Sequence, residues 1–221
     1  MKKLLAVLLI VPTLFLITSC KKEDKHFLTD YISENRINIY TAQSDYGTLS
    51  AELNKSEIPL VKDGIVGDVY TQLVFKIPFT EPEISYELRI NIDGVDYNEK
   101  FTFDPVTNSL TATIYPESFN KTQFDADICL ASNICKVTFT SKLTDGIKNT
   151  ESLLKNLYLS QKTYLDNLTE NGVFNGEITI KILPYKDAFY YYVAITDKKL
   201  NTKAMLFDAV SGEILATKDI F

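Results

Sequence analysis

Asp93-Gly94 joins two segments in which apolar side chains recur at every second position, between Ile84 and Phe103. Such alternation is typical of a strand with one buried face. Asp-Gly between two alternating segments is a strong signal for a two-residue turn, because both turn positions favour a positive φ. The stretch therefore predicts a β-hairpin, and it limits the possible folds more than any other part of the chain.

The register of this hairpin follows from the position of its turn. One face is apolar in all pairs but one, and the opposite face is polar throughout. A slip of one residue would expose the whole apolar set to water, so the register should be well defined. Glu99 is the exception on the apolar face, and it indicates either the margin of a sheet or a small polar site. The expected pairs are Ile92 with Val95, Ile90 with Tyr97, Leu88 with Glu99, Tyr86 with Phe101 and Ile84 with Phe103.

Alternation with a period of two dominates the chain from Ile37 to about Ser141. About seven short strands at this spacing predict an antiparallel β-sandwich of the immunoglobulin or fibronectin III type, over residues 36–142. The chain contains 13 Tyr and 13 Phe, and 45% of its residues are hydrophobic, which is enough apolar material for a packed core.

The period changes to that of a helix between Asn149 and Asn167. Asn149 or Thr150 can cap the start of this helix, and Asn171-Gly172 can stop it. The helix either packs on a sheet of its own domain or presents its apolar side to a partner or a lipid surface. That side carries Leu154, Leu157, Tyr158, Leu165 and Leu168.

Four alternating segments follow the helix and predict an antiparallel meander. One helix on four strands makes an α+β domain over residues 143–221, so the chain as a whole is expected to be mainly β with an α+β C-terminal part. The four segments are Glu177 to Leu183, Phe189 to Thr196, Thr202 to Asp208 and Glu213 to Lys218.

The end of this meander carries a short resemblance. The stretch from Tyr191 to Thr217 contains Leu206-Phe207-Asp208-Ala209-Val210-Ser211-Gly212-Glu213-Ile214-Leu215. It resembles the terminal hairpin of PepSY-type domains, which are small modules outside the cytoplasm that are often linked to protease inhibition. Its Asp-x-x-x-Gly-Glu pattern is mostly turn chemistry.

Tyr190 and Tyr192 share one face of a predicted strand, while Phe189 and Tyr191 share the other. The face with Phe189 is expected to belong to the core. Tyr190 and Tyr192 either pack under the helix or present their rings for stacking on a sugar or for docking a protein.

The first twenty residues have the features of a processing signal and not of a fold element. Lys2 and Lys3 precede an apolar run that is too short to span a bilayer comfortably, and Ile17-Thr18-Ser19-Cys20 closes it. This segment resembles a bacterial lipoprotein signal peptide with its lipobox. The resemblance implies that residues 1–19 are removed and that Cys20 is acylated. An ordinary signal peptide or an uncleaved anchor is the alternative.

Residues 20–35 are then expected to form an acylated, charged tether. The run Lys21-Lys22-Glu23-Asp24 is similar to export signals that send some Gram-negative lipoproteins to the outer face of the outer membrane, and a generic solvated spacer is the alternative. Two or three acyl chains suffice for stable anchoring. We therefore expect a protein held by lipid at the bacterial cell envelope, in the outer membrane, on its periplasmic or exposed face.

With Cys20 assigned to lipid, Cys129 and Cys135 remain as a pair in a compartment where disulfides persist, and a disulfide between them is predicted. Redox catalysis is disfavoured because the spacing is not Cys-x-x-Cys. A structural zinc site is disfavoured because the only histidine, His26, is distant in sequence.

The sequence favours a binding protein over an enzyme. Its only histidine, His26, falls in the expected tether, which argues against catalysis by a nucleophile beside a histidine. Asp125 and Asp127, near the two cysteines, are interpreted as part of a solvated loop and not as a calcium site, and no cofactor or metal is predicted. The chain has 29 acidic and 23 basic residues, which argues against a nucleic-acid partner.

We expect a non-enzymatic module that binds a protein or a glycan at the cell envelope. Two alternatives remain open. One is a polysaccharide-binding accessory of a glycan-uptake system, and the other is an inhibitor or immunity-type protein against a secreted hydrolase.

Overall fold

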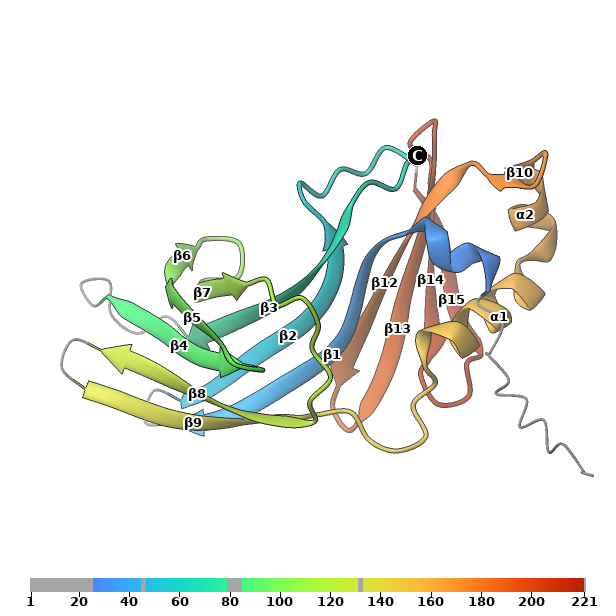
Figure 1. The fold of residues 1–221 in the computed structure, drawn as a ribbon. Coiled ribbons are helices and arrows are strands. Elements are labelled where there is room, and N and C mark those ends of the chain that lie inside the picture. The colour runs from blue at the N-terminus through green and yellow to red at the C-terminus, as the bar shows by residue number, and fades with distance from the viewer. Residues whose placement is uncertain (1–25, 45–46, 79–84, 131–132, 221) are drawn as a thin grey trace, which may run out of the picture.

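The computed structural model describes residues 26–44, 47–78, 85–130 and 133–220. The fold is mainly β with a small helical part, as the sequence predicts (Figure 1). The predicted signal segment, residues 1–19, and the predicted lipidation site, Cys20, lie outside the described residues, as does Ile84 of the expected hairpin.

The N-terminal part is a sandwich of two antiparallel layers. One layer has the strand order β1–β2–β3–β7–β6, and the other has the order β5–β4–β8–β9. Strands β1, β2 and β3 are consecutive neighbours in one layer, whereas the immunoglobulin arrangement places its third strand in the opposite sheet. The first layer comprises β1 (Ile32–Ser44), β2 (Gly47–Glu57), β3 (Val69–Pro78), β6 (Thr102–Asp104) and β7 (Ser109–Ile114), and the second comprises β4 (Tyr86–Ile92), β5 (Val95–Lys100), β8 (Gln123–Leu130) and β9 (Asn133–Ser141).

The core of the sandwich lies between these layers and is rich in aromatic rings. The alternation of Leu73, Phe75 and Ile77 on β3 buries all three side chains. Phe124 of the opposite layer stacks on Phe139 with ring centroids 5.2 Å apart, and Phe75 meets Phe139 edge-on. Offset and edge-on aromatic pairs add stabilisation beyond the area they bury.

The β4–β5 hairpin has the predicted turn. Asp93 and Gly94 adopt φ values of 52° and 90°, and the pairs from Ile92 with Val95 to Glu87 with Lys100 are those expected from the sequence. Strand β5 pairs with β4 alone among the described strands and Glu99 is exposed, so the margin interpretation of Glu99 is confirmed.

The prediction for Phe103 is wrong. The chain leaves the hairpin at Phe101, whose N–H still bonds to the carbonyl of Tyr86, and crosses to the other layer. Phe103 therefore pairs with Leu110 of β7. A strand that changes layers keeps its alternation of side chains, which is why the sequence alone did not reveal the crossing.

The C-terminal part is the predicted meander covered on one face by helices. Strands β12 (Gly176–Tyr185), β13 (Ala188–Asp197), β14 (Thr202–Asp208) and β15 (Ile214–Ile220) are antiparallel neighbours in chain order. The predicted single helix is divided at Gln161 into α1 (Thr150–Ser160) and α2 (Lys162–Asn167). A small hairpin of β10 (Thr169–Glu170) and β11 (Val173–Phe174) follows.

Helix α1 packs on its own sheet, which confirms one of the two expectations for it. The Asn149 side chain accepts a hydrogen bond from the N–H of Ser152 and caps the helix. Leu153, Leu154 and Leu157 are fully buried in a second core against β12, β13 and β14. Within the described ranges, no helix has the length and apolar character needed to cross a membrane.

Strand β1 belongs to both parts of the molecule. One of its edges pairs with β2, while its other edge pairs in parallel with β12 near its start and antiparallel with β9 near its end. Its register with β2 shifts between Arg36 and Asn38, where the strand passes from one part to the other. A single continuous sheet therefore runs through both parts (Figure 1).

The expectation that the tether extends to residue 35 is wrong for its last nine residues. A 3-10 helix, η1 (Phe27–Tyr31), buries Leu28, and β1 begins at Ile32. Ser33 and Asn35 occupy buried positions of β1, so no apolar alternation marks this stretch. Such buried polar groups are tolerated when hydrogen-bonded, and Asn35 donates to the Thr150 hydroxyl at 3.1 Å.

Candidate binding site

A cavity lies where the two parts of the molecule meet, and we call it the junction pocket. It has a volume of about 510 Å³, within the range of ligand pockets. Its wall combines apolar side chains with the charged groups of Asp30, Lys55 and Asp68. It is lined by η1, β1, β2, the start of β3 and the first residue of α1, through Thr29, Asp30, Ile32, Asn35, Ile37, Lys55, Val66, Gly67, Asp68, Val69 and Thr150.

Asn35 is the most buried polar group of this wall. It is 8% exposed, and its amide nitrogen bonds to the Thr150 hydroxyl at the start of α1. Its amide oxygen accepts no hydrogen bond from the described part of the chain. An unsatisfied buried acceptor costs free energy, so Asn35 is a position where a donated hydrogen bond would be stabilising.

One wall of the junction pocket comes from the connection between β2 and β3, residues 58–68, which we call the strap. Lys62 fastens the strap to the second part of the molecule by donating to the hydroxyls of Ser33 and Thr179. The same ammonium lies 3.5 Å from the Glu34 carboxylate. At the far end of the strap, the Glu57 carboxylate accepts a hydrogen bond from the N–H of Gly67 at 2.6 Å.

The middle of the strap lies tightly against the β13–β14 turn. Gly64 has a φ of +79°, and a Cβ at this position would approach the carbonyl carbon of Asp197 to 2.7 Å. Glycine is required there both by its positive φ and by the lack of space.

A carboxyl group is buried beside the strap. Glu177 of β12 is 1% exposed, and neither of its carboxylate oxygens accepts a well-formed hydrogen bond from a described residue, although the Ser33 hydroxyl lies nearby. Burial raises the pKa of Glu177 to about 7, and the neighbouring Lys62 ammonium opposes this effect. Glu57 and Asp63 add to the increase by their negative charges.

Tyr190 and Tyr192 lie on the open face of the meander. Tyr191, between them, faces the helices, is buried, and donates to the carbonyl of Lys148 at 2.6 Å. Packing of Tyr190 and Tyr192 under the helix is therefore excluded by the alternation of β13. Both side chains are partly exposed. Tyr192 borders a shallow hollow of about 250 Å³ lined mainly by apolar atoms of β14 and β15, including Leu206, Ala216 and Ile220.

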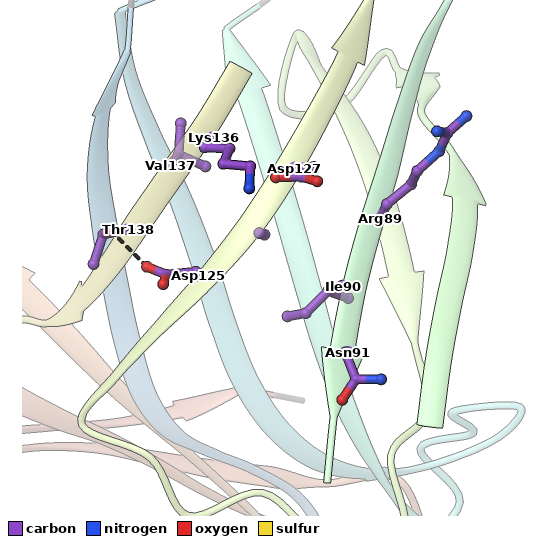
Figure 2. A pocket seen from close by; sticks show the side chains of 9 residues that line it. Arg89, Ile90, Asn91, Asp125, Asp127, Lys136, Val137 and Thr138 are labelled. Carbon is purple, nitrogen blue, oxygen red and sulfur yellow. Dashed lines mark hydrogen bonds between the residues drawn. The ribbon is translucent and has the colours of Figure 1, made fainter. Parts of the chain in front are cut away.

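A polar groove runs over the outer face of β4, β8 and β9 (Figure 2). Asp125 accepts a hydrogen bond from the Thr138 hydroxyl at 2.6 Å, and Asp127 pairs in register with Lys136. The Arg89 guanidinium extends away from both aspartates and binds Glu87 at 2.7 Å. Asp125 and Asp127 thus lie on a strand and not in the expected loop, with partners on the neighbouring strand.

The predicted disulfide between Cys129 and Cys135 is wrong. Both cysteines are free. In the β8–β9 hairpin Cys129 pairs with Ile134, and Cys135 pairs with Ile128. Paired residues point to the same face and adjacent residues to opposite faces, so the two thiols lie on opposite sides of the sheet. A disulfide requires converging Cβ atoms, which this register prevents.

His26 is part of the fold and has a structural role. Its imidazole accepts a hydrogen bond from the N–H of Leu28, and the backbone N–H of His26 donates to the Glu151 carboxylate at 2.6 Å. Burial lowers the pKa of His26. Across the described ranges, no three His, Cys, Asp or Glu side chains come together in a way that would hold a metal ion.

Sequence reasoning did not find the junction pocket or the burial of Glu177 near Lys62. The pocket is assembled from segments that are far apart in the chain, and each segment is an ordinary strand or turn by itself. Glu177 was assigned correctly to a strand, but its burial depends on the strap. The only local signal was the glycine at position 64 in a Lys-Asp-Gly turn.

Comparison with known proteins gives no further guide. No protein-family model matches the chain, and neither the curated proteins nor the solved structures include a match.

Proposed function

We propose that this protein is a lipid-anchored, non-enzymatic binding module of the bacterial cell envelope, and that the junction pocket is its recognition site. The junction pocket is the observation that carries the proposal. It is a concave site of about 510 Å³ that combines apolar walls with a few polar groups, as binding pockets do.

The chemistry of the pocket favours an occupant that carries both a positive and a negative group, or one that carries several hydrogen-bond donors. Asp30 and Asp68 attract a cationic or donor group, and Lys55 attracts an anionic group. The amide oxygen of Asn35 accepts no hydrogen bond within the described chain. A polar side chain of a partner protein, or a small polar group of a glycan, meets these requirements.

Pocket binding is tested by filling the cavity. Val66 lines the pocket and is partly exposed, so Val66→Trp should fill the space without unfolding the chain. The intact, lipidated protein and this variant would serve as bait in solubilised envelope, with captured proteins and glycans identified by mass spectrometry. Val106→Trp is the matched control, because Val106 is 91% exposed in the β6–β7 turn.

A partner that is lost with Val66→Trp and kept with Val106→Trp supports the proposal. Capture that is the same for both variants would assign recognition to another surface. A captured hydrolase would favour the inhibitor or immunity alternative within the same proposal.

The anchor is tested separately. Lipidation rests on the sequence Ile17-Thr18-Ser19-Cys20, and we expect Cys20→Ser to abolish acylation and to move the protein from the detergent phase to the aqueous phase. An unchanged mature mass and unchanged partitioning would remove the anchor from the proposal.

A second candidate function is favoured by the open face of the meander. Tyr190 and Tyr192 are both partly exposed on one face, and Tyr192 borders an apolar hollow. Aromatic rings on a sheet face stack on sugars, so this surface suits a polysaccharide-binding accessory. Tyr192→Ala should then weaken retention on immobilised polysaccharides in affinity electrophoresis, while Tyr185→Ala, exposed at the end of β12, should not.

A further inference from the structure

The folded body begins very close to the proposed anchor. Only five residues separate Cys20 from His26, the first described residue. A fully extended chain spans at most about 3.3–3.6 Å per residue, so His26 can lie no more than about 22 Å from the anchored cysteine. A tether of this length restricts which side of the body can face the bilayer.

His26 lies directly against α1. Its backbone N–H donates to Glu151 at 2.6 Å, and its ring lies 5.7 Å from the ring of Tyr158. Phe27 meets Tyr158 edge-on with ring centroids 5.5 Å apart. The chain therefore joins the body beside α1, on the side of the helix that carries Glu151 and Tyr158.

This side of α1 carries charged and apolar side chains next to one another. Lys155, Tyr158 and Leu159 share one stripe of α1, because three- and four-residue steps return to the same side of a helix. Lys162, the first residue of α2, adjoins this stripe through its ammonium above the Tyr158 ring. The surface exposes the Lys155 ammonium and the Lys162 ammonium, which also forms an ion pair with the Asp166 carboxylate. Two apolar side chains lie beside them, since Leu159 is 75% exposed and Phe27 is 43% exposed. The opposite side of the helix is buried in the core.

We propose that this surface, which consists of Phe27, Lys155, Tyr158, Leu159 and Lys162, lies against the bilayer that holds the acylated Cys20. The inference rests on the proposed lipid anchor and adds an orientation to it. Lysine ammonium groups contact phospholipid phosphates, and Phe27 and Leu159 insert at the level of the headgroups. Tyr158, which carries Lys162 above its ring at 5.3 Å, is an amphipathic side chain suited to the interface.

The neighbouring surface has matching chemistry. A hollow of about 420 Å³ at the break between α1 and α2 is lined by Ser160, Gln161, Thr163 and Asn167, next to Leu159 and Lys162. Hydroxyl and amide groups of this kind suit the phosphate and glycerol groups of a lipid surface. In this orientation the sandwich, which lies at the other end of the molecule from α1 and α2, projects away from the membrane (Figure 1).

The orientation is measurable because the chain contains no tryptophan. A single tryptophan is placed at Leu159→Trp on the proposed surface or at Val106→Trp in the β6–β7 turn of the sandwich, both at exposed positions. The full lipidated protein is reconstituted into vesicles of phosphatidylethanolamine and phosphatidylglycerol with brominated acyl chains. Tryptophan emission is compared with that in unbrominated vesicles of the same composition.

We expect bromine to quench the emission of Leu159→Trp at least twofold more strongly than that of Val106→Trp. We also expect Lys155→Glu with Lys162→Glu to reduce this quenching while the protein still floats with the vesicles. Flotation with equal quenching at both positions, or with none at either, would overturn the orientation and leave the anchor intact. Failure of the lipid-modified chain to float would overturn the anchor, and the orientation with it.

Discussion

The Lys62 ammonium donates a hydrogen bond to the Thr179 hydroxyl, which joins two residues 117 positions apart in the chain. The same ammonium bonds to Ser33 and lies near the Glu34 carboxylate. Lys62 thus links the connection between two sandwich strands to the sheet of the C-terminal part. The strap, the junction pocket and the buried Glu177 all depend on this link.

Removal of Lys62 should loosen the strap. Lys62→Met loses hydrogen bonds from a charged donor, and we expect a loss of about 1–2 kcal/mol in the free energy of unfolding, because the side chain is partly exposed. The loss is measured by urea denaturation. Lys100→Met, at an exposed position of edge strand β5, should change stability by less than about 0.5 kcal/mol. Equal losses for the two variants would mean that Lys62 does not fasten the strap.

Gly64 and Gly172 form a matched pair for testing how tightly the strap packs. Both have a φ of +79°, but only at Gly64 would a Cβ meet the backbone of Asp197 and Lys198, at 2.7 Å. Gly172→Ala should cost about 1–2 kcal/mol, from its backbone conformation alone. Gly64→Ala should cost at least about 1 kcal/mol more, as measured by thermal and urea unfolding. An equal loss in the free energy of unfolding for the two variants would show that the strap moves to make room for the added Cβ.

The Glu177 carboxyl should make stability fall as pH rises through neutrality. Its pKa is raised from 4.5 to about 7 in the folded protein, so it is protonated in both states below about pH 4.5. Between pH 4.5 and 7 the Glu177 carboxyl ionises in the unfolded chain but stays protonated in the folded protein. The free energy of unfolding therefore falls by up to about 3 kcal/mol over this range, since one pKa unit corresponds to about 1.4 kcal/mol.

Glu177→Gln should remove this component. We expect its free energy of unfolding to fall less than that of the unsubstituted protein between pH 4.5 and 8, and to be the higher of the two at pH 8. The comparison is a series of urea titrations across this range, in which the other ionisable groups cancel. Parallel curves would place the pKa of Glu177 near its ordinary value.

Cys129 and Cys135 should both react as thiols. Denaturation without a reductant, followed by alkylation and mass spectrometry, should find two modified cysteines in the body of the protein. Cys129→Ser and Cys135→Ser should leave the unfolding midpoint independent of reductant, as in the unsubstituted protein. A peptide pair joined through both cysteines would contradict the β8–β9 register.

Local signals in the sequence predicted much of the fold. The Asp93-Gly94 turn, with both residues at positive φ, defined the hairpin register without any knowledge of its neighbours. The cap at Asn149 and the order of the meander were also predictable, because each depends on residues that are near one another in the chain.

Relationships between distant segments were not predictable. The parallel pairing of β1 with β12 brings together residues 32–36 and 178–181, and no local pattern encodes it. Ser33 and Asn35 are buried in this segment. Because these buried residues are polar, the segment resembled a solvated tether in the sequence. The disulfide prediction failed by a single step of register, since Cys135 pairs with the neighbour of Cys129.

Because β1 pairs with strands of both parts, the molecule cannot be split into two independently folding halves. Its first residues complete the sheet under the helices, and its last residues close the sandwich against β9. Cutting the gene between the two halves would therefore deprive one fragment of a central strand, whichever side received it. The two halves should fold only when both fragments are present and reassemble. Cleavage by a protease within β1 should destabilise both halves at once.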